Sequence, residues 1–249
     1  MIEFFQPYVD NWSSWWPQLA LATWYTIVLT ALSYLLALVL GLILAFGRLS
    51  KVRFKAFGPL KKSRFLASER LSKILSVSGL CRAYIELMRG IPALALLFLL
   101  YYGLESMGIR LDRFSAAVIG LGMNQGAYLS EVFRGGIEAL HKGQREAALA
   151  VGMTPAKAYR HILMPQAVRI VLPPLLNMLI ILLKDSSICS LISTPELMLR
   201  TKDLASMSFL PMHCYLLAGL IYFVMAFPLS RITRRVEIHM KRGMHGATA

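Results

Sequence analysis

The segment from Gly143 to Pro165 reads Gly-Gln-Arg-Glu-Ala-Ala-Leu-Ala-Val-Gly-Met-Thr-Pro-Ala-Lys-Ala-Tyr-Arg-His-Ile-Leu-Met-Pro. The residues before Gly152 are good helix formers, and a glycine at that position is suited to ending a helix. Thr154 followed by Pro155 is the pattern of an N-cap and a first helical turn. Pro165 either ends this second helix or begins the next one. The segment therefore predicts two short helices separated by a break.

The expected pair of helices carries very small side chains on its surface. Ala147, Ala148 and Gly152 leave that surface almost bare, so the backbone of another protein could approach it closely. Charged residues such as Glu146 supply polar edges. The alternative is an amphipathic helical linker between two larger elements, because alanine-rich helical turns are common.

The composition favours a membrane protein over a soluble one. Of the 249 residues, 57% are hydrophobic and only 16% are charged, and a soluble domain of this size rarely needs uncharged runs as long as those found here. The three cysteines and five histidines show no spacing typical of a disulfide framework or a metal site, so no metal is expected. The net charge of +14 is compatible either with nucleic-acid binding or with the basic cytoplasmic loops of a membrane protein.

Five stretches are long and apolar enough to cross a bilayer as helices. They are residues 19–47, 84–104, 114–133, 168–192 and 214–231. Clustered tryptophans (Trp12, Trp15 and Trp16) precede the first stretch and are typical of the membrane interface. We therefore expect an all-α membrane protein of about five transmembrane helices, with a single transmembrane domain over residues 1–249.

The basic residues are sorted between the two sides of the expected membrane. Of the 27 Lys and Arg residues, 22 lie in the segments 48–89, 134–169 and 231–242. A nucleic-acid binder would not distribute its charge in this way, so no nucleic-acid partner is expected. The positive-inside rule places these three segments in the cytoplasm, which puts the N-terminus outside and the C-terminus inside. Contact with anionic lipid headgroups is the favoured explanation of the long basic loop 48–83.

The spacing within the segment 143–165 resembles the EAA loop of bacterial ABC importer permeases. The matching positions are Glu146-Ala147-Ala148, Gly152 and Ile162-Leu163-Met164-Pro165. Met164 is the one departure, since the family usually has leucine there, and this exchange conserves volume. The resemblance implies that the segment is a cytoplasmic, two-part coupling helix that docks into a cleft of the ATP-hydrolysing subunit. The residues implied in this coupling are Glu146, Ala147, Ala148, Gly152, Ile162 and Pro165.

Further stretches resemble the polar amino acid subfamily of these permeases, which transports solutes of the histidine, glutamine or arginine type. They are Glu86–Pro92 with the run to Tyr102, Asn124–Glu131 with Phe133–Gly136, Lys184–Ser187 with Pro195–Leu197, and Tyr222–Phe223 with Pro228–Arg231. Because all of them occur in order, the resemblance covers nearly the whole chain.

This resemblance implies a permease subunit that moves a polar amino acid across the bacterial inner membrane by alternating access. Its partners would be ATP-binding cassette ATPase subunits, a second permease subunit (a second copy or a paralogue), an extracytoplasmic solute-binding protein and membrane lipid. The chain has no GxxxxGK[ST] phosphate loop, so ATP and magnesium would be bound by the partner subunit and no cofactor by this chain. No enzymatic activity is expected of the chain itself.

The third expected span carries polar residues that are candidates for the solute path. Asn124, Tyr128 and Glu131 share one helix face at the spacing i, i+4 and i+7. Hydrogen bonding between helices explains the asparagine and the tyrosine equally well, and a gate or a salt bridge is the favoured role for Glu131 near the inner interface. Gly122 and Gly126 form a small-xxx-small pair that allows another helix to come close.

The fourth expected span contains the further candidates Lys184, Asp185 and Ser186. A charge in the middle of a membrane costs roughly 2.5–3.5 kcal/mol on insertion scales, so each charged residue needs a partner or water. One interpretation is that Lys184 and Asp185 form ion pairs that hold the helices together. The other is that Asp185, with Ser186, lines the solute site or its gate, because an amino acid zwitterion offers both charges.

Two other classes of function are compatible with the sequence. An intramembrane hydrolase could use Ser186 or Ser187 with His213, although the sequence offers no obvious carboxylate to orient the histidine. A membrane-anchored scaffold would instead bind its partners through the basic loops.

Overall fold

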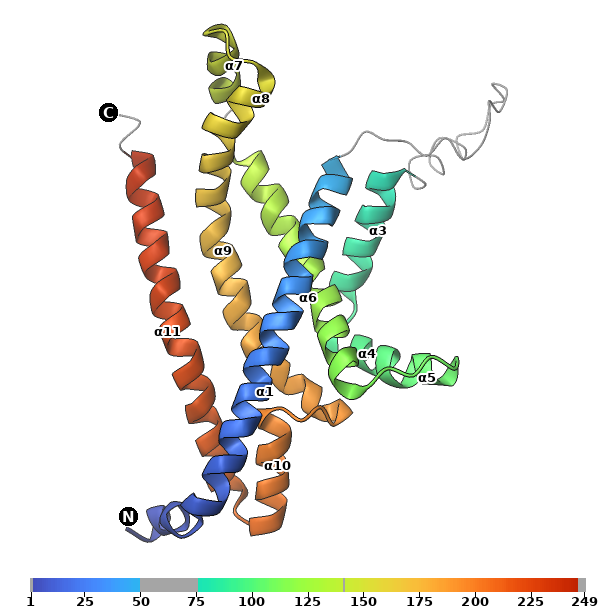
Figure 1. Cartoon of the computed structure of the whole chain (residues 1–249), viewed down its shortest axis with the longest axis vertical. Coiled ribbons are helices and arrows are strands. Elements are labelled where there is room, and N and C mark those ends of the chain that lie inside the picture. Colours follow the sequence, from blue (N-terminus) through green and yellow to red (C-terminus); the bar gives the residue numbers. More distant parts are fainter. Residues whose placement is uncertain (1, 50–75, 141, 246–249) are drawn as a thin grey trace.

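The computed structural model describes residues 2–49, 76–140 and 142–245. In these ranges the chain is helical and contains no strand, so the expected all-α class is confirmed. The long helices of the bundle are α1 (Ile2–Leu49), α6 (Arg113–Glu138), α9 (Met164–Asp185) and α11 (Pro211–His245), shown in Figure 1. Most of the basic loop 48–83 lies outside the described residues.

The largest contact between two helices joins α1 to α6. A Cβ atom placed on Gly126 would lie 3.0 Å from the Cβ of Leu40, and one placed on Gly122 would overlap the side chain of Leu36. Gly41 of α1 is just as close to α6, because a Cβ there would lie 3.2 Å from the carbonyl oxygen of Gly126. The predicted close approach at Gly122 and Gly126 is therefore observed, and α1 is the helix that approaches.

The second expected span, 84–104, is not one straight helix. α3 (Val77–Gly90) and the helical segment that begins at Ala93 meet at an angle of 105°. Ile91 has φ −93° and ψ 128°, because the proline that follows it disfavours the α conformation. After the bend come α4 (Ala93–Phe98), the π-helix η1 (Leu99–Gly103) and α5 (Leu104–Ser106), which turn away from the long axis of the bundle in Figure 1.

The main core lies where α1, α4, α6 and α9 meet. Leu29, Leu97, Leu121 and Leu182 are fully or almost fully buried there. α6 begins beside this core at the N-cap Asp112, which accepts a hydrogen bond of 3.0 Å from the backbone N–H of Ser115. Hydrogen bonds from Ser115 also lower the pKa of the Asp112 carboxyl.

α9 is followed by the 3-10 helix η3 (Ser186–Ile192) and by α10 (Leu197–Ser208). α10 lies in the expected loop between the fourth and fifth spans and packs against α11 and α1. Ser193 ends η3 in the left-handed conformation, with φ 56°. The chain thus forms a short additional helix at the end of the bundle that also holds the N-terminus (Figure 1).

Three helical segments of the described residues are long and apolar enough to cross a membrane: Phe4–Arg48, Pro155–Ile192 and Pro211–Met240. The bent pair formed by α3 and the segment Ala93–Ser106 would make a fourth. α6 has 26 residues but is not among these segments, because its polar side chains, such as Asn124 and Glu131, make it less apolar. The described residues thus support three or four spans where the sequence predicts five.

We predict that Gly41→Ala weakens the contact between α1 and α6. The new methyl group would lie 2.9 Å from the Cβ of Leu129 and close to α6 backbone atoms, which cannot move aside cheaply. The free energy of unfolding in detergent should fall by about 1–3 kcal/mol. Gly219→Ala in α11 is the matched control, since a Cβ there meets nothing within 4 Å. Equal thermal stability of the two variants would contradict the close contact.

Candidate functional site

The segment 143–165 forms two helices with a break, as its sequence predicts. α7 (Lys142–Ala150) ends in a Schellman motif, in which Met153 N–H donates to the Ala148 carbonyl at 3.1 Å and Gly152 N–H to the Leu149 carbonyl at 3.0 Å. Gly152 has φ +79°, the left-handed conformation that this motif needs. The hydroxyl of Thr154 then caps α8 (Pro155–Ala158) by accepting from the N–H of Lys157 at 3.4 Å.

The two helices project beyond the neighbouring helices at one end of the molecule (Figure 1), which we call the α7–α8 end. Glu146, Ala147, Gly152 and Pro165 are exposed, and Ile162 is half-buried. The remaining candidate, Ala148, is 3% exposed, so it is not part of the bare surface. The exposed surface also includes Val151 (78%) beside the break. A small-residue tip with an apolar residue at its turn is thus open to a partner.

Helical structure continues from α8 into the bundle without interruption. α8 passes into the π-helix η2 (Tyr159–Leu163), then into α9 and finally into η3. Pro165 lies in the first turn of α9, directly after η2, so it does not end the helical segment that starts at Pro155. The resulting helical rod, Pro155–Ile192, has 38 residues and is about 57 Å long. It connects the α7–α8 end directly to Lys184, Asp185 and Ser186.

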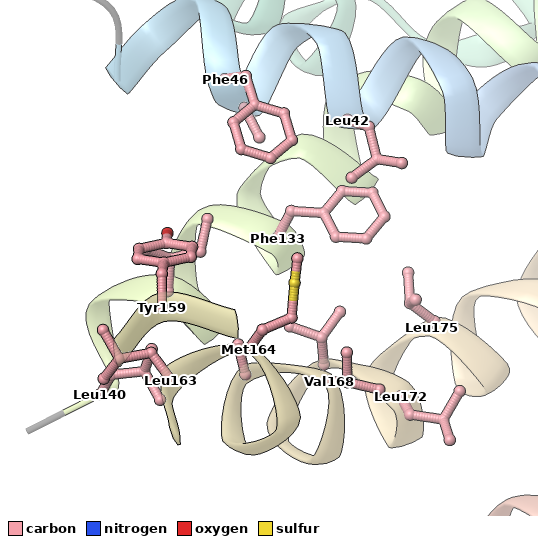
Figure 2. Close-up of a pocket in the computed structure, with 14 residues that line it drawn as sticks. Leu42, Phe46, Phe133, Leu140, Tyr159, Leu163, Met164, Val168, Leu172 and Leu175 are labelled. Atoms are coloured by element: carbon pink, nitrogen blue, oxygen red, sulfur yellow. The ribbon is translucent and has the colours of Figure 1, made fainter. Parts of the chain in front are cut away.

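An apolar groove of about 220 Å³ lies between this rod and the ends of α1 and α6. Figure 2 shows Leu42 and Phe46 of α1 and Phe133 of α6 facing Met164 and Val168 of α9 across it. The groove is open to the surface beside the N-terminal part of the rod. Next to it α9 packs closely on α6, because a Cβ atom on Gly136 would overlap the side chain of Val171.

The polar residues of α6 connect it to two different helices. The side chain of Asn124 donates to the Met88 carbonyl of α3 at 2.8 Å, and the Arg89 guanidinium lies 5.4 Å from the centre of the Tyr128 ring. On the neighbouring face, Gln125 donates to the Met178 carbonyl of α9 at 3.1 Å. Asn124 and Tyr128 therefore link α6 to α3.

Glu131 forms an ion-pair network where α1 and α6 approach the α7–α8 end. Its carboxylate pairs with Arg48 of α1 and, at 2.7 Å, with Arg134 of α6, which also pairs with Glu138. The side chains of Glu131, Arg48 and Arg134 are only 20–29% exposed. Sequence reasoning missed both arginines. The available signal was that Arg48 directly follows the first apolar stretch and so lies at the same membrane depth as Glu131.

The second group of candidates lies apart from Asn124 and Tyr128. Lys184 is exposed and Asp185 is half-buried, and neither makes an ion pair within the described part of the chain. Ser186 is buried and donates to the Leu183 carbonyl at 2.7 Å. Among the described residues, ion pairing between helices is therefore not observed for Lys184 or Asp185. Their charges remain available to a solute, water or a second subunit.

A buried carboxylate that sequence reasoning did not single out joins α10 to α11 at the opposite end. Glu196 is fully buried and accepts hydrogen bonds from the N–H groups of Met198 and Leu199 and from the Tyr222 hydroxyl, at 2.7–2.9 Å. Leu197 N–H donates to the Thr26 hydroxyl of α1 at 3.0 Å. These contacts fix the start of α10 against α1 and α11. The sequence did contain a signal for this contact, since Pro195 followed by Glu196 is typical of the start of a helix.

The geometry does not favour a hydrolase. The hydroxyls of Ser186 and Ser187 donate to the carbonyls of Leu183 and Lys184, and His213 contacts the Phe4 carbonyl at 3.0 Å. No nucleophile–base pair is formed among these residues, as acyl-transfer chemistry would need. The described residues also contain no group of three or more side chains suited to a metal ion.

Comparison with known proteins identifies the family. The L-cystine transport system permease protein TcyB of Bacillus subtilis (strain 168) is 35% identical over 230 residues, which are 92% of this chain and 89% of that protein. The glutamine transport system permease protein GlnP of Escherichia coli (strain K12) is 30% identical over 236 residues, which are 93% of this chain and 98% of that protein. A crystal structure of an amino acid ABC transporter with histidines superposes with a TM-score of 0.78 at 30% identity, covering 92% of this chain and 97% of that one.

The family of binding-protein-dependent transport system inner membrane components matches residues 66–242. Its members among the relatives are permeases, not ATPases, which agrees with the absence of a phosphate loop from the sequence. This chain therefore belongs to the binding-protein-dependent transport system inner membrane components and is an inner-membrane permease subunit of an ABC importer.

Proposed function

We propose that this subunit imports a polar amino acid by alternating access, with five spans, its N-terminus outside and its C-terminus in the cytoplasm. The similar permeases and the similar structure support an amino acid as the solute. A pair of ATPase subunits, a second permease subunit and an extracytoplasmic binding protein would complete the transporter. No ATP, magnesium or other cofactor is assigned to this chain, because its sequence has no phosphate loop.

The charge distribution supports this orientation. Positive charge gathers at the α7–α8 end, towards which α11 also runs with its basic C-terminal part (Figure 1). The basic residues described at this end are Arg48, Arg134, Arg145, Lys157, Arg160, Arg231, Arg234 and Arg235. Basic segments next to spans remain in the cytoplasm. The ATPase would therefore meet the α7–α8 end.

The uninterrupted rod Pro155–Ile192 is the observation that carries the proposed coupling mechanism. The α7–α8 pair would sit in a cleft of the ATPase through its exposed Glu146, Ala147 and Gly152. A continuous helical segment can transmit displacement along its axis, so motion of the ATPase would reach Asp185 about 45 Å away. Pro165, Pro173 and Pro174 each omit one backbone hydrogen bond but do not end the segment. The apolar groove beside Met164 leaves space next to the rod, and movement of the rod would break the hydrogen bonds that Tyr34 of α1 and Gln125 of α6 donate to its carbonyls.

The Glu131 network and the charges at Lys184 and Asp185 suit two different parts of this cycle. The pairing of Glu131 with Arg48 and Arg134 holds α1 and α6 together beside the cytoplasmic end, where an inner gate would be. Lys184 and Asp185 have no ion-pair partner within the described residues, so they are the stronger candidates for contact with a zwitterionic solute. Asn124 and Tyr128 would act mainly by fixing α3.

We predict that Glu146→Lys separates ATP hydrolysis from transport. Reversing an exposed charge in the docking surface should lower ATP-driven amino acid uptake into vesicles by roughly tenfold or more, while membrane insertion stays normal. Gly152→Trp should act in the same way, because it adds bulk at the bare turn and strains the left-handed backbone. Lys202→Glu, an exposed charge reversal on α10, is the control. Normal uptake by both coupling variants would argue against docking at α7–α8.

We also predict that Asp185→Ala changes the preference among amino acids. Removal of a charged hydrogen-bond partner of the solute should weaken uptake on the order of tenfold and alter the ranking of competing amino acids. Asp10→Ala provides a control at an exposed aspartate elsewhere. Uptake kinetics and competition profiles that match the unmodified transporter would show that Asp185 does not contact the solute.

A further inference from the structure

A second cleft, separate from the groove of Figure 2, lies between α1 and α10 at the end opposite to α7–α8. Its volume is about 390 Å³. α1 and α10 contribute both apolar and polar side chains to its walls, and the lining residues used below are Gln18, Leu21, Tyr25, Leu199, Arg200 and Asp203. None of these side chains belongs to the candidate solute path or to the coupling segment.

The two helices run in opposite directions along the cleft. One end of the cleft is apolar and the other is polar. The start of α10 is fixed beside Thr26, because the N–H of Leu197 donates to that hydroxyl. Farther along α10, Leu204 belongs to the same buried cluster as Trp15 and Leu19. Followed towards the N-terminal part of α1, the cleft is therefore lined by Leu199, Arg200 and Asp203 of α10, in that order. Tyr25 lies at the apolar end of the cleft and Gln18 at the polar end.

The ion pair between Arg200 and Asp203 is long and leaves hydrogen-bonding capacity free on both side chains. The distance between Arg200 Nη1 and Asp203 Oδ2 is 3.5 Å, longer than the 2.7–2.9 Å of a good charge-assisted hydrogen bond. Both side chains are about two-fifths exposed. A ligand with an anionic group next to an ammonium group could approach both at once, with its anion at Arg200 and its ammonium one turn farther out at Asp203.

The residues around the cleft are of the kinds that contact membrane lipids. Trp12 and Trp16 stack with ring centres 5.2 Å apart, are about half exposed, and precede Gln18 by less than two turns. Exposed tryptophans of this kind lie at the level of lipid headgroups. Leu21 and Tyr25 continue towards the membrane interior and are 59% and 40% exposed, so the apolar part of the cleft opens onto the surface that faces acyl chains or a neighbouring subunit.

We propose that this cleft binds a zwitterionic aminophospholipid of the phosphatidylethanolamine class. The phosphate contacts the Arg200 guanidinium, the ammonium group contacts the Asp203 carboxylate, and an acyl chain lies along Leu21 and Tyr25. The order of groups in such a lipid, from chain to phosphate to ammonium, is the order of apolar, basic and acidic side chains along the cleft. A free amino acid has no chain to cover the apolar half. The site does not depend on which solute is transported.

Native mass spectrometry of the delipidated transporter tests this proposal. Phosphatidylethanolamine, phosphatidylcholine and phosphatidylglycerol with identical acyl chains would be titrated in turn. The ethanolamine lipid should bind on the order of tenfold more tightly than the other two, because only its headgroup offers Asp203 a positively charged N–H donor: choline has no N–H, and the glycerol hydroxyls are uncharged. Arg200→Gln should weaken all three lipids. Asp203→Asn should remove the preference for ethanolamine, and Asp203→Glu should restore most of it.

The control is Lys202→Gln, which removes a charge from the exposed side of α10 and should leave all three affinities unchanged. Thermal melting of each variant in the same detergent shows whether α10 stays folded. Equal binding of the three lipids, or an ethanolamine preference that survives in a folded Asp203→Asn variant, would overturn the proposal. Displacement of the bound lipid by free L-glutamine would overturn it as well, because the cleft would then be a solute site.

Discussion

The continuous helical segment from Pro155 to Ile192 is the constraint on which the rest of this structure depends, although Pro173 and Pro174 inside α9 each omit a backbone hydrogen bond. It makes the projecting α7–α8 pair and the charged residues Lys184 and Asp185 two ends of one rod. Pro165 at the junction of η2 with α9 does not end the rod, and neither do Pro173 and Pro174 within α9. A protein that must convert contact at one end into rearrangement at the other has a direct mechanical connection in this helix.

The rod acts against a frame of two closely packed helices. Gly41, Gly122 and Gly126 bring the backbones of α1 and α6 together, and the Glu131 ion pairs connect the same two helices near the α7–α8 end. Between this frame and the start of the rod lies an apolar groove, and farther along Tyr34 and Gln125 donate hydrogen bonds to carbonyls of the rod. At the far end, Leu197 N–H connects α10 to Thr26 of α1, and Glu196 connects α10 to Tyr222 of α11. A frame held together at these points and a rod that borders an open groove suit alternating access, which needs one unit to move relative to another.

Local chemistry explains what could be predicted from the sequence. The break at Gly152 and the cap at Thr154 depend on neighbouring residues alone, so their positions were predictable, as was the close approach at Gly122 and Gly126. The pairing of Glu131 with Arg48 spans 83 positions, and the partner of Asn124 is a backbone carbonyl, so neither could be identified without the fold. The bend before Pro92 did have a local signal, but the apolar run across it suggested one span.

The central claim is that the rod moves as one body, and distances between spin labels test it most directly. Labels at Lys157 and Ile181, both exposed, would lie about 36 Å apart along the rod, and a second pair would join Ile181 to the exposed Val39 of α1. The measurement needs the assembled transporter with its native cysteines replaced, compared with and without ATP. The account predicts a constant distance within the rod and a shift of more than about 2 Å between Ile181 and Val39. A distance within the rod that changes while Ile181 and Val39 stay fixed would contradict it.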